Sequence, residues 1–194
     1  MFKKVTVKFL LLAVLCFVFS SCIITEFKQY FFKINADGSG TGTIKFINIV
    51  SEEDEEQNVS TTDFDELINN YINGTAFEEA NPNFNVISKE LFEENGVLNG
   101  QVEFTFEDLQ DIGFYHYQRS EHAPIMFYLG SFSETLLETD GEYLGGAKDE
   151  EGGIPMIVWA PGTTEFTFKT AIKDEMSNVH TLLEHYNLWL EVNK

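Results

Sequence analysis

Apolar and polar positions alternate with period two along much of the chain, and clusters of turn-forming residues separate the alternating runs. Two such runs, Tyr30–Ile34 and Thr41–Ile49, flank a segment rich in Asn, Asp, Gly and Ser. Alternation indicates half-buried strands and the intervening residues favour a reversal, so we expect a β-hairpin here. A second hairpin is expected over residues 84–106, because Asn95-Gly96 is a strong two-residue turn signal.

Between these hairpins the apolar spacing changes to the three-to-four-residue period of a helix. Thr61 or Thr62 can cap the start of this helix, and Asn73-Gly74 favours its end. After the second hairpin, a shorter helical turn is expected to end near Gly113. The apolar face of the longer helix would consist of Phe64, Leu67, Ile68, Tyr71 and Ile72.

Further strands are expected over residues 125–137, 154–159 and 165–169, with Gly130 as a bulge in the first of them. The pattern at the C-terminal end is ambiguous, and we favour a helix over about 174–185 followed by a terminal strand. This order of elements predicts an α+β fold, a mainly antiparallel β-sheet with two to three helices packed on it.

The N-terminal segment has a different pattern. Three lysines precede an unbroken apolar run, Phe9–Phe19, and two serines and Cys22 follow it. This arrangement is typical of a secretory signal peptide, and the run is short of the roughly 20 apolar residues that span a bilayer. An uncleaved N-terminal anchor and simple secretion are the two alternatives.

Phe19-Ser20-Ser21-Cys22 resembles the lipobox of bacterial lipoproteins, in the relaxed form found in Bacteroidetes. The resemblance implies that residues 1–21 are removed as a lipoprotein signal peptide and that Cys22 is acylated. The implied organisation is a short tether over 22–27 and a single α+β domain over 28–194. The other cysteine, Cys16, lies inside the leader, so the mature domain would contain no further thiol.

The residues after the lipobox bear on localisation. In the lipoproteins that this chain resembles, an Asp after the Cys favours inner-membrane retention, and an acidic run favours export to the surface. Ile23-Ile24-Thr25 has neither feature. By resemblance, we expect the periplasmic face of the outer membrane.

Two short motifs lie at the turn of the first expected hairpin and at the end of the second, Asp37-Gly38-Ser39-Gly40 and Phe106-Glu107-Asp108-Leu109. Together with the order of elements, they resemble the LppM-like lipoproteins over roughly residues 27–109. This resemblance implies a compact α+β module that contacts lipids or envelope glycolipids and performs no catalysis.

The net charge of the chain limits the classes of molecule that it can bind. The chain has 12 Lys and Arg against 32 Asp and Glu, a net charge of −20. Loss of the three leader lysines would change this value to −23. The balance excludes nucleic acid as a partner and excludes attachment to anionic lipid through a basic patch. The expected contact with the membrane is therefore the lipid anchor.

One segment carries an unusual set of chemistry-bearing side chains. Its arginine could clamp a carboxylate or phosphate of a ligand, and its histidines with a glutamate could contribute to a metal site. The structural alternative is an aromatic strand edge with an internal salt bridge. The candidate ligand-binding residues are Tyr115, His116, Tyr117, Arg119 and His122, and the candidate metal-binding set is His116, Glu121 and His122.

No serine-nucleophile, nucleotide-binding or close metal-ligand motif appears in the sequence, so no cofactor is expected. The favoured hypothesis is a non-catalytic envelope lipoprotein that binds a lipid, a glycolipid or a partner protein on an aromatic face of its sheet. The alternative is a metal-dependent envelope hydrolase that uses His116, Glu121 and His122.

Overall fold

The computed structural model describes residues 22–120, 122–131, 134–145, 153–172 and 176–193. The expected signal peptide and Glu121 lie outside these residues. The described structure is mostly antiparallel β-sheet, with 48% strand and 23% helix. This content is compatible with the α+β expectation, although "mainly β" describes it better.

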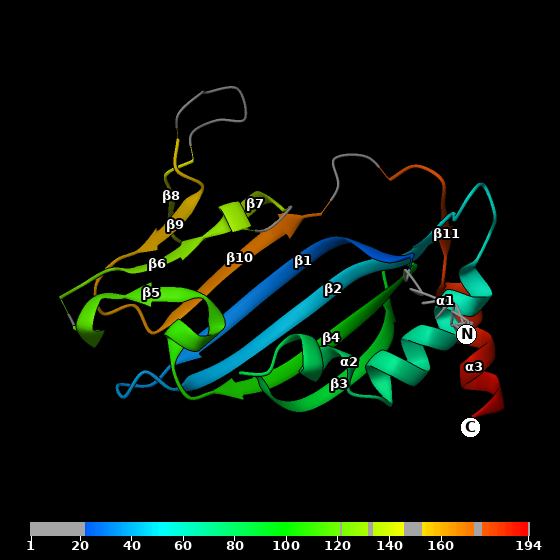
Figure 1. The fold of residues 1–194 in the computed structure, drawn as a ribbon, viewed down its shortest axis with the longest axis horizontal. Helices are drawn as coiled ribbons and strands as arrows, with labels where there is room; N and C mark the ends of the chain where they lie inside the picture. The colour runs from blue at the N-terminus through cyan, green and yellow to red at the C-terminus, as the bar shows by residue number, and fades with distance from the viewer. Residues whose placement is uncertain (1–21, 121, 132–133, 146–152, 173–175, 194) are drawn as a thin grey trace, which may run out of the picture.

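The strands form two sheets (Figure 1). The larger sheet has the order β3-β4-β2-β1-β10-β7, and β11 pairs with one end of β2. Its strands are β1 (Ile23–Ile34), β2 (Gly40–Glu52), β3 (Asn85–Glu94), β4 (Val97–Phe106), β7 (Thr135–Thr139), β10 (Glu165–Ala171) and β11 (Val179–Thr181). The smaller sheet has the order β5-β6-β9-β8, with strands β5 (Phe114–His116), β6 (Ile125–Tyr128), β8 (Glu142–Tyr143) and β9 (Met156–Trp159).

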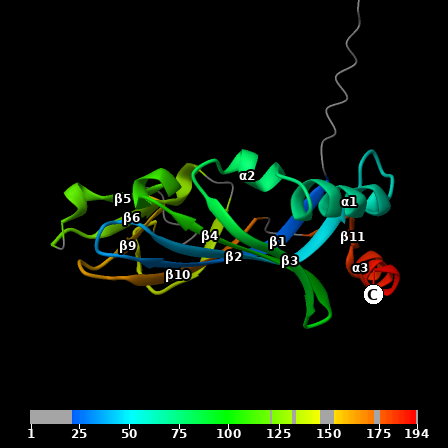
Figure 2. The same ribbon diagram turned by 90° about the horizontal axis from the view of Figure 1, so that it is seen from below.

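The helices gather mainly at one end of the larger sheet. Figure 2 shows α1 and α2 on one side of this sheet and α3 toward the opposite side. Their bounds are α1 (Ser60–Glu66), continued by the π-helical η1 (Leu67–Ile72), α2 (Ala76–Ala80) and α3 (Leu183–Val192); short 3₁₀ turns are η2 (Leu109–Ile112), η3 (Tyr117–Arg119) and η4 (Leu129–Ser131). No helix among the described residues is long and apolar enough to cross a membrane.

The local sequence signals are confirmed. Both hairpins form, and Asn95 and Gly96 adopt the positive φ angles, 58° and 78°, that their tight turn requires. The expected helix is present as α1 and η1, and Gly113 ends η2 in the left-handed conformation. The short helix α2 was not predicted from the sequence.

Three expectations are corrected by the structure. The tether expected over 22–27 is largely part of the sheet, because β1 begins at Ile23 and pairs with β2 from that residue. The single strand expected over 125–137 is two strands, β6 and β7, which belong to different sheets. At the C-terminal end the order is reversed, because Val179 pairs with Glu52 in the sheet and the following residues form α3.

Two apolar clusters hold the layers together. In the first, aromatic residues on one face of the larger sheet pack against the smaller sheet; Phe32 and Phe114, for example, have ring centroids 4.9 Å apart. We call this side of the larger sheet the inner face. The second cluster lies where α1, η1 and α3 meet the sheet, and consists of Ile49, Phe64, Leu67, Ile68, Leu98, Leu182 and Tyr186.

The inner face can be tested with adjacent residues of β1. Phe32 is 3% exposed within the first cluster, whereas Phe31 points to the opposite face and is 41% exposed. Phe32→Ala should lower the free energy of unfolding by about 3–5 kcal/mol, because it leaves a cavity in an aromatic core. Phe31→Ala should lower it by less than about 1 kcal/mol. Urea denaturation measures both values, and equal losses would contradict this assignment of faces.

Candidate functional site

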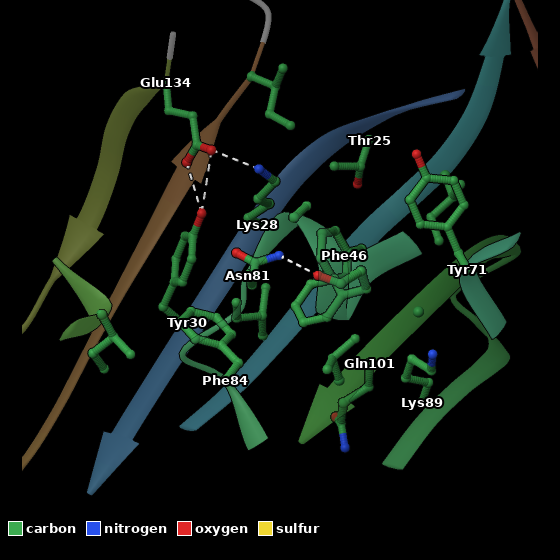
Figure 3. Close-up of a pocket in the computed structure, with 18 of the residues that line it drawn as sticks. Thr25, Lys28, Tyr30, Phe46, Tyr71, Asn81, Phe84, Lys89, Gln101 and Glu134 are labelled. Atoms are coloured by element: carbon green, nitrogen blue, oxygen red, sulfur yellow. Dashed lines mark hydrogen bonds and ion pairs between the residues drawn. The ribbon is translucent and has the colours of Figure 1, made fainter. Parts of the chain in front are cut away.

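A groove of about 720 Å³ lies over the inner face, between the two apolar clusters (Figure 3). Strands β1, β2 and β4 contribute its floor, and η1, α2 and the turn at residues 81–84 contribute to its walls. The side chains that line it are predominantly apolar or aromatic. They include Tyr30, Phe46, Tyr71, Ile72, Phe77 and Phe84.

Strand register places a glycine in the floor of the groove, next to Phe46. Lys28, Phe46 and Gly100 are direct neighbours across β1, β2 and β4. Because Gly100 has no side chain, the side chains of Ile49 and Leu91 can occupy the space beside it. A Cβ atom at Gly100 would lie 3.0 Å from Cδ1 of Ile49, so the glycine also allows the neighbouring side chains to approach closely.

A largely buried lysine side chain, that of Lys89, holds the wall formed by α2. Nζ of Lys89 donates to the carbonyl oxygen of Gly74 at 2.6 Å and lies 2.7 Å from the carboxylate of Glu78 on α2. This bond lowers the pKa of the Glu78 carboxyl. The turn at residues 81–84, which forms another part of the wall, is held by aromatic stacking. The rings of Phe84 and Phe104 stack with their centroids 4.1 Å apart.

A carboxylate with three donors lies at another side of the groove (Figure 3). Glu134 has a side chain that is only 7% exposed, and it accepts from Nζ of Lys28 at 2.7 Å and from the Thr170 hydroxyl at 2.6 Å. The Tyr30 hydroxyl donates to it at 3.1 Å. Burial first, and then the Glu134 charge, raise the pKa of Tyr30, so this hydroxyl remains a protonated donor.

The N-terminal end of β1 also lines the groove. Ile23, Ile24 and Thr25 are lining residues, and they directly follow Cys22. The backbone oxygen of Cys22 accepts from the amide of Glu52 at 2.8 Å, which fixes this residue at the sheet. Burial and the nearby carboxylates raise the pKa of the Cys22 thiol, which is the opposite of what an activated nucleophile needs.

The segment singled out in the sequence lies elsewhere. Tyr115 and Tyr117 are about half exposed, Nε2 of His116 is 2.9 Å from the oxygen of Ser120, and His122 is exposed. The side chain of Arg119 and all of Glu121 lie outside the described residues. The described members of the segment line neither the groove nor a smaller cavity of about 530 Å³ beside β9.

Within the described part of the chain, no group of three or more His, Cys, Asp or Glu side chains is placed to hold a metal ion. The described lining of the groove includes no histidine, cysteine or serine. Its lining is predominantly apolar with a few polar groups, a composition that is typical of small-molecule sites.

Sequence reasoning missed the groove, although one signal was available. Lys28 and Lys89 occupy positions on the inner face, where the strand pattern calls for apolar residues. Comparisons with protein-family models, with curated proteins and with solved structures found no match.

Lys89→Met should loosen α2, because it removes the ammonium group that joins Gly74 and Glu78 to β3. We expect at least tenfold faster hydrogen exchange at the backbone amides of residues 76–81. Lys33→Met is the control, since Lys33 forms an exposed ion pair with Glu165 away from α2. The assignment would be wrong if both variants exchanged at the wild-type rate in this segment.

Proposed function

We propose that this protein is a membrane-anchored envelope lipoprotein whose groove binds an acyl chain of a lipid, without catalysis. The single observation that carries the proposal is an apolar groove whose lining includes Ile23, the residue after the candidate acylation site. Its α+β architecture, with helices packed on an antiparallel sheet, would be the scaffold of this binding module.

The size and chemistry of the groove support this proposal. Its volume of about 720 Å³ falls within the range of small-molecule sites, roughly 300–1,000 Å³. Removal of each CH₂ group from water contributes about 0.8 kcal/mol. A buried stretch of ten such groups would therefore contribute about 8 kcal/mol relative to water, and far less relative to a bilayer.

The position of the groove gives a reason for the anchor. If Cys22 carries the lipid, a lining residue of the groove, Ile23, directly follows the membrane attachment point. The acidic domain would otherwise be repelled by anionic surfaces, so the lipid supplies the attraction. A location at the periplasmic face of the outer membrane, and the resemblance to LppM-like lipoproteins, fit a partner that is itself an envelope lipid or glycolipid.

Blocking the groove tests the binding. Ala80 lies at the exposed rim of the groove, and its neighbour Glu79 on α2 is not a lining residue. In the full chain extracted in mild detergent, Ala80→Trp should reduce the binding of a fluorescent palmitoyl phospholipid at least tenfold. Glu79→Trp should retain it. Absence of binding by the wild-type chain, or equal effects of both tryptophans, would refute the proposal.

Lipidation of Cys22 can be tested with a matched control, because the chain has one other cysteine, Cys16. Cys22→Ala should leave an uncleaved precursor and abolish metabolic labelling with radioactive palmitate, because the acceptor thiol is lost. Cys16→Ala changes a leader residue and should preserve both processing and labelling. Continued labelling of the Cys22→Ala chain would show that the lipid is attached elsewhere.

A further inference from the structure

The lysines of the groove are both neutralised. Lys28 pairs with Glu134 at 2.7 Å, and Lys89 pairs with Glu78 at the same distance. The remaining acidic side chains of the described lining, Glu90 and Asp111, are exposed. The described lining therefore offers a ligand no uncompensated positive charge.

The net charge of the whole chain also disfavours an anionic ligand. This charge is −20, which disfavours the approach of an anion. Screening at physiological salt reduces this effect beyond about 8 Å, but it acts less on charges that are partly buried. An anionic head group would be repelled or left unpaired here, whereas a head group with balanced charges would not.

We propose that the groove selects a zwitterionic phospholipid over an anionic one, and that Glu134 and Glu78 determine this specificity by neutralising Lys28 and Lys89. The inference rests on the function proposed above and adds the class of head group. Glu134 suits the role because its side chain is 7% exposed and held by three donors. Lys28 is 24% exposed and is a lining residue, so its charge would face the ligand if it were not balanced.

The inference predicts a gain of binding when one charge is removed. Glu134→Gln keeps one oxygen that can accept from Lys28, and its amide nitrogen can donate to the Tyr30 and Thr170 hydroxyls, but the lysine charge is left uncompensated. Coulomb's law at about 10 Å with an effective dielectric constant of about 20 gives an effect of more than tenfold. The variant should therefore bind phosphatidylglycerol about tenfold more tightly than the wild type.

The experiment uses the full chain in a neutral detergent and two probes with identical acyl chains, phosphatidylethanolamine and phosphatidylglycerol. Wild type should prefer the former by about tenfold in competition for the fluorescent palmitoyl phospholipid. Glu165→Gln is the control, because it changes the total charge equally but frees Lys33, which is exposed and not a lining residue. Its preference should match that of the wild type.

A second variant keeps the test informative if the Glu134→Gln variant does not fold. Glu78→Gln releases Lys89 in the same way, and the Glu78 side chain is less buried than that of Glu134. Equal binding of the two lipids by the wild type, or an unchanged preference in both glutamine variants, would overturn the head-group inference and leave the acyl-binding function standing. No binding of either lipid would overturn the proposed function itself.

Discussion

The structure depends on one constraint, which is that the aromatic face of the larger sheet must be covered. The smaller sheet packs on Phe32, Phe166 and Phe168 at one end of this face, and η1 packs on it through the second cluster at the other end. Two separate covers leave a gap between them, and the groove is that gap. The position of the groove therefore follows from the way the face is buried at its two ends.

The polar groups in the groove follow from the same constraint. A lysine on an apolar face costs free energy unless its charge is balanced, and the structure supplies a carboxylate to each of the two. The two pairs also connect elements, since Glu134 joins the residues before β7 to β1, and Glu78 joins α2 to β3. The two ion pairs hold the walls of the groove in place, and they also neutralise the lysine charges that would attract an anionic ligand.

Elements that are specified by neighbouring residues were predicted from the sequence. Features that depend on residues far apart in the chain were missed. Asn95-Gly96 and the helical spacing around Phe64 specify their elements from neighbouring residues, and both are confirmed. Nothing in the alternation of residues 125–137 says that the chain changes sheets at Leu129, because that depends on which strand it meets. The groove was hidden for the same reason, since Lys28, Phe46 and Gly100 become neighbours only through strand register.

Strand β1 connects the candidate anchor to the core without an intervening linker. It begins at Ile23, pairs with β2 from there and with β10 from Phe27, and reaches the first cluster at Phe32. If Cys22 is lipidated as proposed, the domain cannot turn freely on a flexible tether. The membrane would then meet one fixed end of the larger sheet, where Ile23 and Ile24 line the groove, so an acyl chain would need to move only a short distance to enter.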